Sequence, residues 1–84
     1  MLQYTTAPLR ELKLGNNRIT DPTALMYLGS LERLDVSGNN IGIISPFKLM
    51  TSLQWLNLSN NPLDEDAIAE LRAALPECEI VFDK

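Results

Sequence analysis

An eleven-residue pattern recurs through this chain at intervals of 22 residues. Its clearest copy is LQWLNLSNNPL, residues 53–63, with apolar residues at positions 1, 4, 6 and 11 and asparagine at position 9. The same positions match in LERLDVSGNNI (31–41) and LRELKLGNNRI (9–19), so chance is a poor explanation. A fixed period of this length indicates that one structural unit is stacked repeatedly. A degenerate fourth copy, again 22 residues on, is predicted at Leu75, Cys78, Ile80 and Asp83.

The spacing within each copy favours a short buried strand. The apolar residues at positions 4 and 6, such as Leu56 and Leu58, are two apart and therefore face the same side of an extended chain. One strand cannot bury its own apolar face, but stacking the copies in parallel register buries a continuous row. We therefore predict that Leu12, Leu34 and Leu56 form a contiguous interior row.

The asparagines at position 9 stand where the chain must turn sharply after the strand. An asparagine side chain both donates and accepts, so it can pair with backbone groups that the turn would leave buried and unpaired. We therefore interpret these asparagines as a structural ladder, in which each side chain pairs with backbone groups of the turns. The alternative interpretation is a ladder of residues that bind a partner, but buried polar groups are generally paired within the protein, which favours the structural ladder. Its members are Asn17, Asn39 and Asn61.

The first two return segments contain the signals of short helices. Asp21-Pro22 is typical of a helix start, because aspartate is a good N-cap and proline suits the first helical position. This predicts a short helix over residues 22–28, and Ser45-Pro46 predicts an equivalent start in the second segment. Phe47 then takes the place, facing the sheet, that Leu25 has 22 residues earlier.

The third return segment differs from the other two. Acidic residues at 64–66 precede an alanine-rich stretch, which predicts the strongest helix of the chain with Asp64 as its N-cap. Ile68, Leu71 and Leu75 form one apolar stripe along this helix. The following strand, near residues 78–82, is rich in charge, as an edge strand should be.

Length and charge limit the classes of protein. The 84 residues suit one domain, divided into an N-terminal edge (1–8), repeats at 9–30, 31–52 and 53–74, and a C-terminal capping strand (75–84). Leu2 and Tyr4 are candidates for covering the open N-terminal end.

The net charge of −4 disfavours nucleic-acid and anionic-membrane partners. The single cysteine excludes an internal disulfide and favours a cytoplasmic location, with secretion remaining an alternative if an export signal was removed.

The residues that commonly carry catalysis or bind metals are sparse. The chain contains no histidine, and Cys78 at a core position is expected to be a buried small hydrophobe rather than a nucleophile. The acids at 64–66 lack the spacing of a calcium loop and suit a helix N-terminus better. Asn57-Leu58-Ser59 is a glycosylation sequon that matters only in a secreted chain. The sequence predicts no enzyme, no cofactor and no metal.

The three copies resemble the 22-residue class of the leucine-rich-repeat superfamily, which includes bacterial internalins and a regulatory subunit of protein phosphatase 1. ISPFKLMTSL (44–53) resembles the internalin linking segment, and DEDAIAELRAALPECEI (64–80) resembles the closing helix and strand of such proteins. The resemblance implies an α/β fold: a right-handed solenoid with a short curved parallel sheet on its concave side and short helices or irregular turns on its convex side. It also implies binding of other proteins at the concave face.

If positions 4 and 6 point inward, positions 3 and 5 point onto the concave face. The candidate partner-binding residues are therefore Glu11, Arg33, Trp55 and Glu77 at position 3, and Lys13, Asp35, Asn57 and Glu79 at position 5. Glu11–Arg33 and Lys13–Asp35 are expected as cross-strand ion pairs, which contribute at most about 1 kcal/mol each when solvated. Trp55 is either an interface hot spot or a cover for the sheet stacked on Arg33.

The predicted concave face is small. Four strands about 4.8 Å apart span about 15 Å, which gives a face below the roughly 800 Å² per partner of a standard interface. We therefore expect a non-catalytic module for a protein partner that binds weakly, uses its flanks, associates with itself through a sheet edge, or belongs to a longer array. The alternative is a structural unit without a ligand of its own, either an engineered minimal solenoid or the C-terminal fragment of a longer array.

Overall fold

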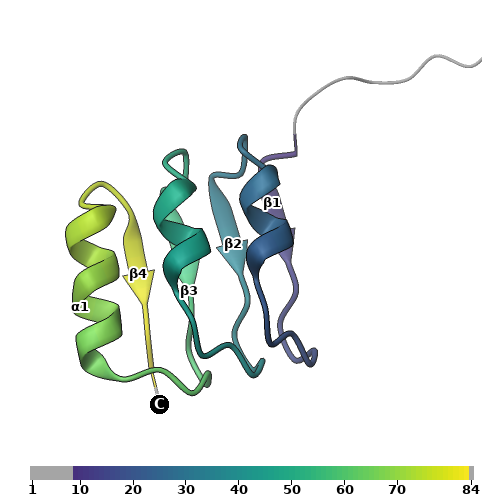
Figure 1. The fold of residues 1–84 in the computed structure, drawn as a ribbon. Helices are drawn as coiled ribbons and strands as arrows, with labels where there is room; N and C mark the ends of the chain where they lie inside the picture. The colour runs from purple at the N-terminus through teal and green to yellow at the C-terminus, as the bar shows by residue number, and fades with distance from the viewer. Residues whose placement is uncertain (1–8, 84) are drawn as a thin grey trace, which may run out of the picture.

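A computed structural model describes residues 9–83, so the roles expected for Leu2 and Tyr4 lie outside the described residues. Within that range the chain forms a parallel sheet in which the strands are ordered as they occur in the sequence (Figure 1). The strands are three residues each: β1 (Glu11–Lys13), β2 (Arg33–Asp35), β3 (Trp55–Asn57) and β4 (Glu79–Val81).

Each strand is joined to the next by a segment that crosses one face of the sheet. The crossings contain the 3-10 helices η1 (Thr23–Tyr27) and η2 (Ser45–Leu49), followed by the α-helix α1 (Glu65–Ala74). All three helices lie on the same side of the sheet (Figure 1). The result is the α/β right-handed solenoid that the sequence pattern and the resemblance predicted.

The row of position-4 leucines is confirmed. Leu12 pairs with Leu34, and Leu34 with Leu56, across three neighbouring parallel strands. Leu34 and Leu56 are fully buried, whereas Leu12, on the first strand, is partly buried. The 22-residue period therefore places like residues from successive coils side by side.

The structural role of the asparagine ladder is confirmed at Asn39 and Asn61, whereas Asn17 is exposed and, among the described residues, bonds only within its own coil. Asn61 Nδ2 donates to the carbonyls of Leu58 and Ser59 in its own coil and to that of Val36 in the preceding coil, while its Oδ1 accepts the Ile41 N–H at 3.0 Å. Asn39 makes the same set of bonds one coil earlier. Both side chains are buried. Each thus ties two consecutive coils together.

The helix starts differ in detail from the prediction. The helix η1 spans Thr23–Tyr27 rather than the predicted 22–28, and Pro22 occupies its N-cap in place of Asp21. The Asp21 carboxylate accepts the Thr23 hydroxyl and, at 2.9 Å, the Thr23 N–H, and these bonds lower the pKa of Asp21. Ser45 does not precede η2 but is its first residue, and Ile44 occupies the N-cap. Pro46 fits at the second position of η2 because a backbone N–H at that position would have no acceptor within the helix, and proline has no N–H.

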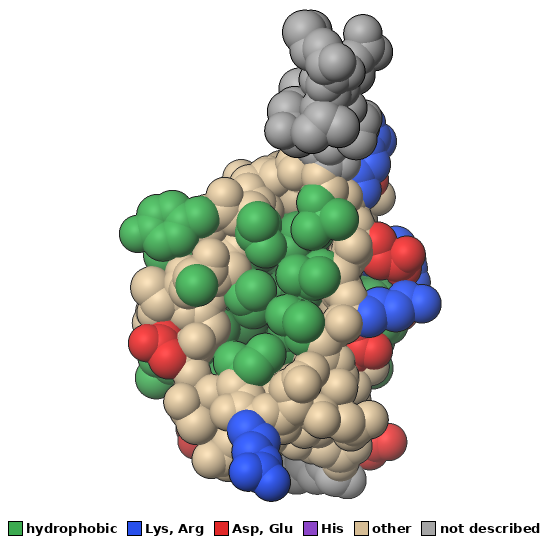
Figure 2. Space-filling model, turned by 90° about the vertical axis from the view of Figure 1, so that its right-hand side faces the viewer, with side chains coloured by type: hydrophobic (Ala, Val, Ile, Leu, Met, Phe, Trp, Pro, Cys, Tyr) green, Lys and Arg blue, Asp and Glu red, His purple; other side chains and the backbone are tan. Residues whose placement is uncertain are grey.

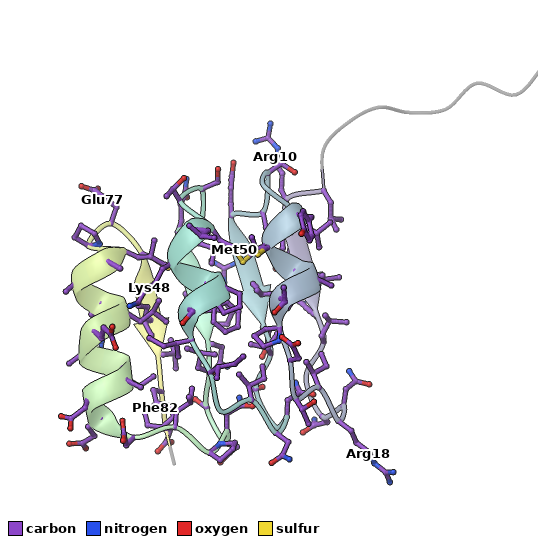
Figure 3. The ribbon with its side chains drawn as sticks, viewed as in Figure 1. Arg10, Arg18, Lys48, Met50, Glu77 and Phe82 are labelled. Atoms are coloured by element: carbon purple, nitrogen blue, oxygen red, sulfur yellow. The ribbon has the colours of Figure 1, made fainter. Side chains whose placement is uncertain are left out.

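The predictions for α1 are confirmed. The Ala67 N–H donates to the Asp64 carboxylate at 2.8 Å, which makes Asp64 the N-cap. The apolar stripe of Ile68, Leu71 and Leu75 is buried against the rest of the core. Lys48 of η2 forms an ion pair with Glu70, so α1 is also joined to the preceding helix (Figure 3).

The register predicted for the last strand is wrong by two residues. Leu56 pairs with Ile80, 24 positions later, and not with Cys78. An α-helix advances about 1.5 Å per residue and a 3-10 helix about 2.0 Å, so an α-helical return segment needs more residues to cover the same distance. Asp83 therefore does not occupy the asparagine position. The Asp83 N–H donates at 3.0 Å to the Oγ of Ser59, which is the position-7 residue of the preceding coil.

Candidate functional site

The face of the sheet opposite the helices carries the outward side chains of positions 3 and 5. In the observed register, position 3 presents Glu11, Arg33, Trp55 and Glu79 in neighbouring strands. The first three were predicted at this position. Glu77 was predicted as the fourth, but it lies in the turn after α1 and not in β4 (Figure 3). Glu79 takes its place, and Val81 takes the position-5 place predicted for Glu79.

Arg33 is the centre of this face. Its guanidinium lies 4.6 Å from the centroid of the Trp55 ring on one side and 3.5 Å from the Glu11 carboxylate on the other. Both charged side chains are about half exposed, so the ion pair itself contributes little to stability. The stacking keeps the Trp55 ring beside a cation, with part of the ring accessible to a partner.

In β2 and β3 the position-5 side chain bonds to the turn that follows the strand. The Asp35 carboxylate accepts both the N–H and the hydroxyl of Ser37, and Asn57 Oδ1 accepts the Ser59 N–H at 3.0 Å. Short side chains of this type commonly bond to the backbone two residues on, where a strand turns. The predicted Lys13–Asp35 ion pair is absent from the described residues.

A hollow of about 240 Å³ lies on this face over β1 to β3. Its lining is Glu11, Leu12, Lys13, Arg33, Asp35 and Trp55. Two acidic and two basic side chains surround one aromatic ring, so the formal charges of the lining cancel. This chemistry suits a protein surface that presents both signs of charge around an apolar side chain. It offers no positive field for a nucleic-acid backbone.

A second hollow opens where the strands begin, and the sequence reasoning missed part of it. It is lined by Glu32, Thr51, Ser52, Leu53, Gln54 and Glu77. Arg10 pairs with Glu32 at 3.5 Å, and Figure 3 shows Arg10 and Glu77 on the side of the molecule where the strands begin, over the first and the last coil respectively. The signal that could have found Glu32 was position 2 of the pattern, where charged or polar residues recur at Arg10, Glu32 and Gln54.

Cys78 lies beside the start of β4, half buried against the core. Burial raises the pKa of its thiol, and the negative charge of Glu79 adds to the same direction. A raised pKa keeps the thiol protonated near neutral pH, and only the thiolate is a good nucleophile or metal ligand. Cys78 therefore suits packing better than chemistry, but it is only partly buried, and Ile80 occupies the core position that was predicted for it.

We expect iodoacetamide to alkylate Cys78 several-fold more slowly at pH 7.5 in the folded protein than in urea. The physical reason is the raised pKa together with partial burial of the sulfur. Mass spectrometry against time measures the rate, which should rise as the pH increases. A folded rate equal to the unfolded rate would show that Cys78 is a reactive thiol.

Residues 9–83 offer neither a cluster of metal ligands nor a membrane-spanning helix. In that range no group of three or more His, Cys, Asp or Glu side chains is arranged to hold a metal ion. None of the helices in the same range is both long and apolar enough to cross a membrane.

The comparisons with known proteins agree with this architecture. The family model described as leucine rich repeat matches residues 7–63. The crystal structure of an internalin from Listeria monocytogenes superposes with a TM-score of 0.74 at 30% sequence identity and covers 87% of this chain. The chain spans 21% of the length of that internalin. No curated protein sequence matches the chain.

Proposed function

This chain belongs to the leucine-rich-repeat family, and from that premise we propose that it is a non-catalytic module that binds a protein partner through the concave face around Trp55. Proteins of this family are typically protein-interaction modules. The fold alone does not select a partner, because function resides in the side chains that a fold presents. The proposal therefore depends on what the concave face offers.

The stacking of Trp55 on Arg33 is the observation that carries the proposal. Tryptophan and arginine are the residue types most enriched among interface hot spots, especially near the centre of a contact surface. Here they lie on the two middle strands, with β1 and β4 on either side. A partner that covers Trp55 would exclude water from the Arg33 guanidinium and strengthen its interactions with carboxylates.

The charges around this pair define the chemistry of the partner. Glu11 and Lys13 lie on one side of Arg33 and Trp55, and Glu79 lies on the other. We infer that the partner places an apolar or aromatic side chain on Trp55 and an acidic group within reach of Lys13, whose ammonium forms no ion pair within the described residues. Such complementarity sets specificity and association rate more than affinity.

We expect Trp55→Ala to weaken partner binding by at least about tenfold, since hot-spot tryptophans commonly contribute 2 kcal/mol or more. The wild-type chain would be immobilised, its retained partner identified by mass spectrometry, and the affinity of the purified partner measured by calorimetry. Tyr27→Ala is the matched control, because Tyr27 is a 79% exposed aromatic on η1, away from the concave face.

The result for Tyr27→Ala should equal that of the wild type, and circular dichroism should show both variants folded. Equal affinity of the Trp55→Ala and wild-type chains would contradict the proposed binding face. The proposal that the protein has a partner could then survive only at another surface.

The second candidate function is a structural unit without a ligand of its own. Its support is that polar side chains of the concave face already have partners within the chain: Glu11 with Arg33, Asp35 with Ser37, and Asn57 with Ser59. On this alternative, Trp55→Ala lowers the free energy of unfolding by removing the cover of the sheet, and no purified protein binds with measurable affinity.

A further inference from the structure

The outer side of β1 is unpaired within the described residues 9–83. The equivalent backbone groups of the next coil, in β2 and the turn after it, show which backbone groups the β1 edge exposes. The carbonyls of Asp35 and Ser37 accept the N–H groups of Leu14 and Asn16 at 2.7 and 2.9 Å. The carbonyls 22 residues earlier belong to Lys13 and Gly15, and they point outward in the same way. Because backbone groups alternate along a strand, the N–H and C=O of Glu11 also point outward.

Apolar side chains accompany these backbone groups. Leu9 is 47% exposed, and the hydrophobic residues of this coil are only partly buried, whereas their equivalents one coil later are buried. Figure 2 looks onto this end of the solenoid and shows hydrophobic side chains gathered in one continuous area. The members of this apolar end are Leu9, Leu12, Leu14, Ile19, Leu25 and Leu28.

The opposite end of the sheet is protected. Glu79 and Val81 bond toward β3, through the Gln54 carbonyl and the Leu58 N–H, which leaves the backbone of Ile80 pointing outward. The guanidinium of Arg72, from α1, donates to the Ile80 carbonyl at 3.2 Å. Occupied groups of this kind discourage edge-to-edge pairing. Of the two edges, the β1 edge is therefore the one available for another strand.

We propose that the β1 edge pairs with the β1 edge of a second copy of this chain, antiparallel and centred on Leu12. Leu12 bonds toward β2, so Leu12 opposite its own equivalent forms a non-hydrogen-bonded pair. The flanking residues then form hydrogen-bonded pairs. The outward N–H and C=O of Glu11 bond to the C=O and N–H of Lys13 in the second copy, and Lys13 bonds in the same way to Glu11 of the second copy. The short strand Glu-Leu-Lys is thus self-complementary in hydrogen bonding.

The same register is self-complementary in charge. Glu11 and Lys13 both project onto the concave face and are both exposed. In the antiparallel pair each Glu11 carboxylate lies opposite the Lys13 ammonium of the second copy. Opposite charges directly across a strand pair stabilise it and like charges destabilise it. The Lys13 ammonium thereby gains the carboxylate that it does not have within the described chain.

A two-fold axis perpendicular to the sheet generates this pairing. It keeps both concave faces on one side and brings the two apolar ends together on the other. Because the contact uses the same patch on both copies, it closes at two and does not grow into a filament. The concave face of the dimer is twice that of one chain, which brings it toward the area of a standard interface.

The experiment is sedimentation equilibrium of the 84-residue chain over a hundredfold range of concentration, with Glu11→Lys and Lys13→Glu studied alone and mixed. The wild type should approach twice its 9.4 kDa mass as concentration rises. Each variant alone places like charges opposite each other and should dimerise at least about tenfold more weakly. The mixture of the two variants restores opposite charges at every pair and should form a heterodimer.

Glu79→Lys is the matched control, because it reverses a charge at the same position of the protected edge. It should dimerise as the wild type does. A wild-type chain that stays monomeric throughout overturns the proposal and leaves the β1 edge to a different occupant, such as a preceding coil. Dimerisation of Lys13→Glu alone as tight as that of the wild type overturns it as well. The mass is measured without any partner, so this result is independent of the proposed binding function.

Discussion

Replacing Asn61 with alanine should lower the free energy of unfolding by about 3–5 kcal/mol, because each buried polar group left without a partner costs about 1–3 kcal/mol. The side chain is buried and makes four hydrogen bonds, three as donor and one as acceptor. Two of these reach the preceding coil, at Val36 and Ile41. Alanine cannot replace them, and water has little access to the space that would be left.

Asn17 provides the control, since it occupies the same position of the first copy. Its side chain is exposed and, among the described residues 9–83, donates only to the Leu14 and Gly15 carbonyls of its own coil, at 2.8 and 3.3 Å. Asn17→Ala should therefore cost less than about 1 kcal/mol. Urea denaturation followed by circular dichroism measures both variants. Equal losses for the two would mean that the bonds between coils contribute nothing, which contradicts the ladder as a source of stability.

The sequence predicted the repeating part of this fold because its period is encoded directly. Position-4 leucines 22 residues apart can share an interior row only if the coils stack in parallel register, and Leu12, Leu34 and Leu56 do so. The buried asparagines follow from the same geometry, since each turn presents the same unpaired backbone groups.

The last strand was misplaced because positions 4 and 6 are apolar in two registers. Cys78 and Ile80 supply apolar residues at positions 4 and 6 in the predicted register, and Ile80 and Phe82 supply them in the observed one. The choice is made by α1, whose ten residues advance less per residue than a 3-10 helix. Sequence pattern alone counts residues, whereas register depends on the distance that the return segment covers.

The candidate site was predicted unevenly for a related reason. Position 3 is the first residue of each strand and faces solvent, and its side chains Glu11, Arg33 and Trp55 lie together as expected. Position 5 stands at the strand end, where Asp35 and Asn57 also serve the turn. Alternation predicts only which face a side chain is on. It does not predict which nearby backbone groups compete for that side chain.

Replacing Phe47 with alanine is expected to be as damaging as the loss of Asn61. Phe47 lies in η2, is fully buried, and packs in the core between the sheet and the neighbouring helices. Large-to-small substitution of a buried phenylalanine costs about 3–5 kcal/mol through lost burial and the remaining cavity. A domain of this size is stable by only about 5–10 kcal/mol, so the variant should show a large fall in its denaturation midpoint.

Substitutions of two leucines test whether position in the solenoid, rather than hydrophobicity, sets the loss in free energy of unfolding. Leu49 is in the same helix and 63% exposed, so Leu49→Ala should change the free energy of unfolding by less than about 0.5 kcal/mol. Leu25 is the equivalent of Phe47 one coil earlier but is only partly buried at the apolar end, so Leu25→Ala should fall between the two. Urea denaturation at low protein concentration gives the three values. A loss for Leu49→Ala that matched that of Phe47→Ala would contradict the assignment of Phe47 to the centre of the core.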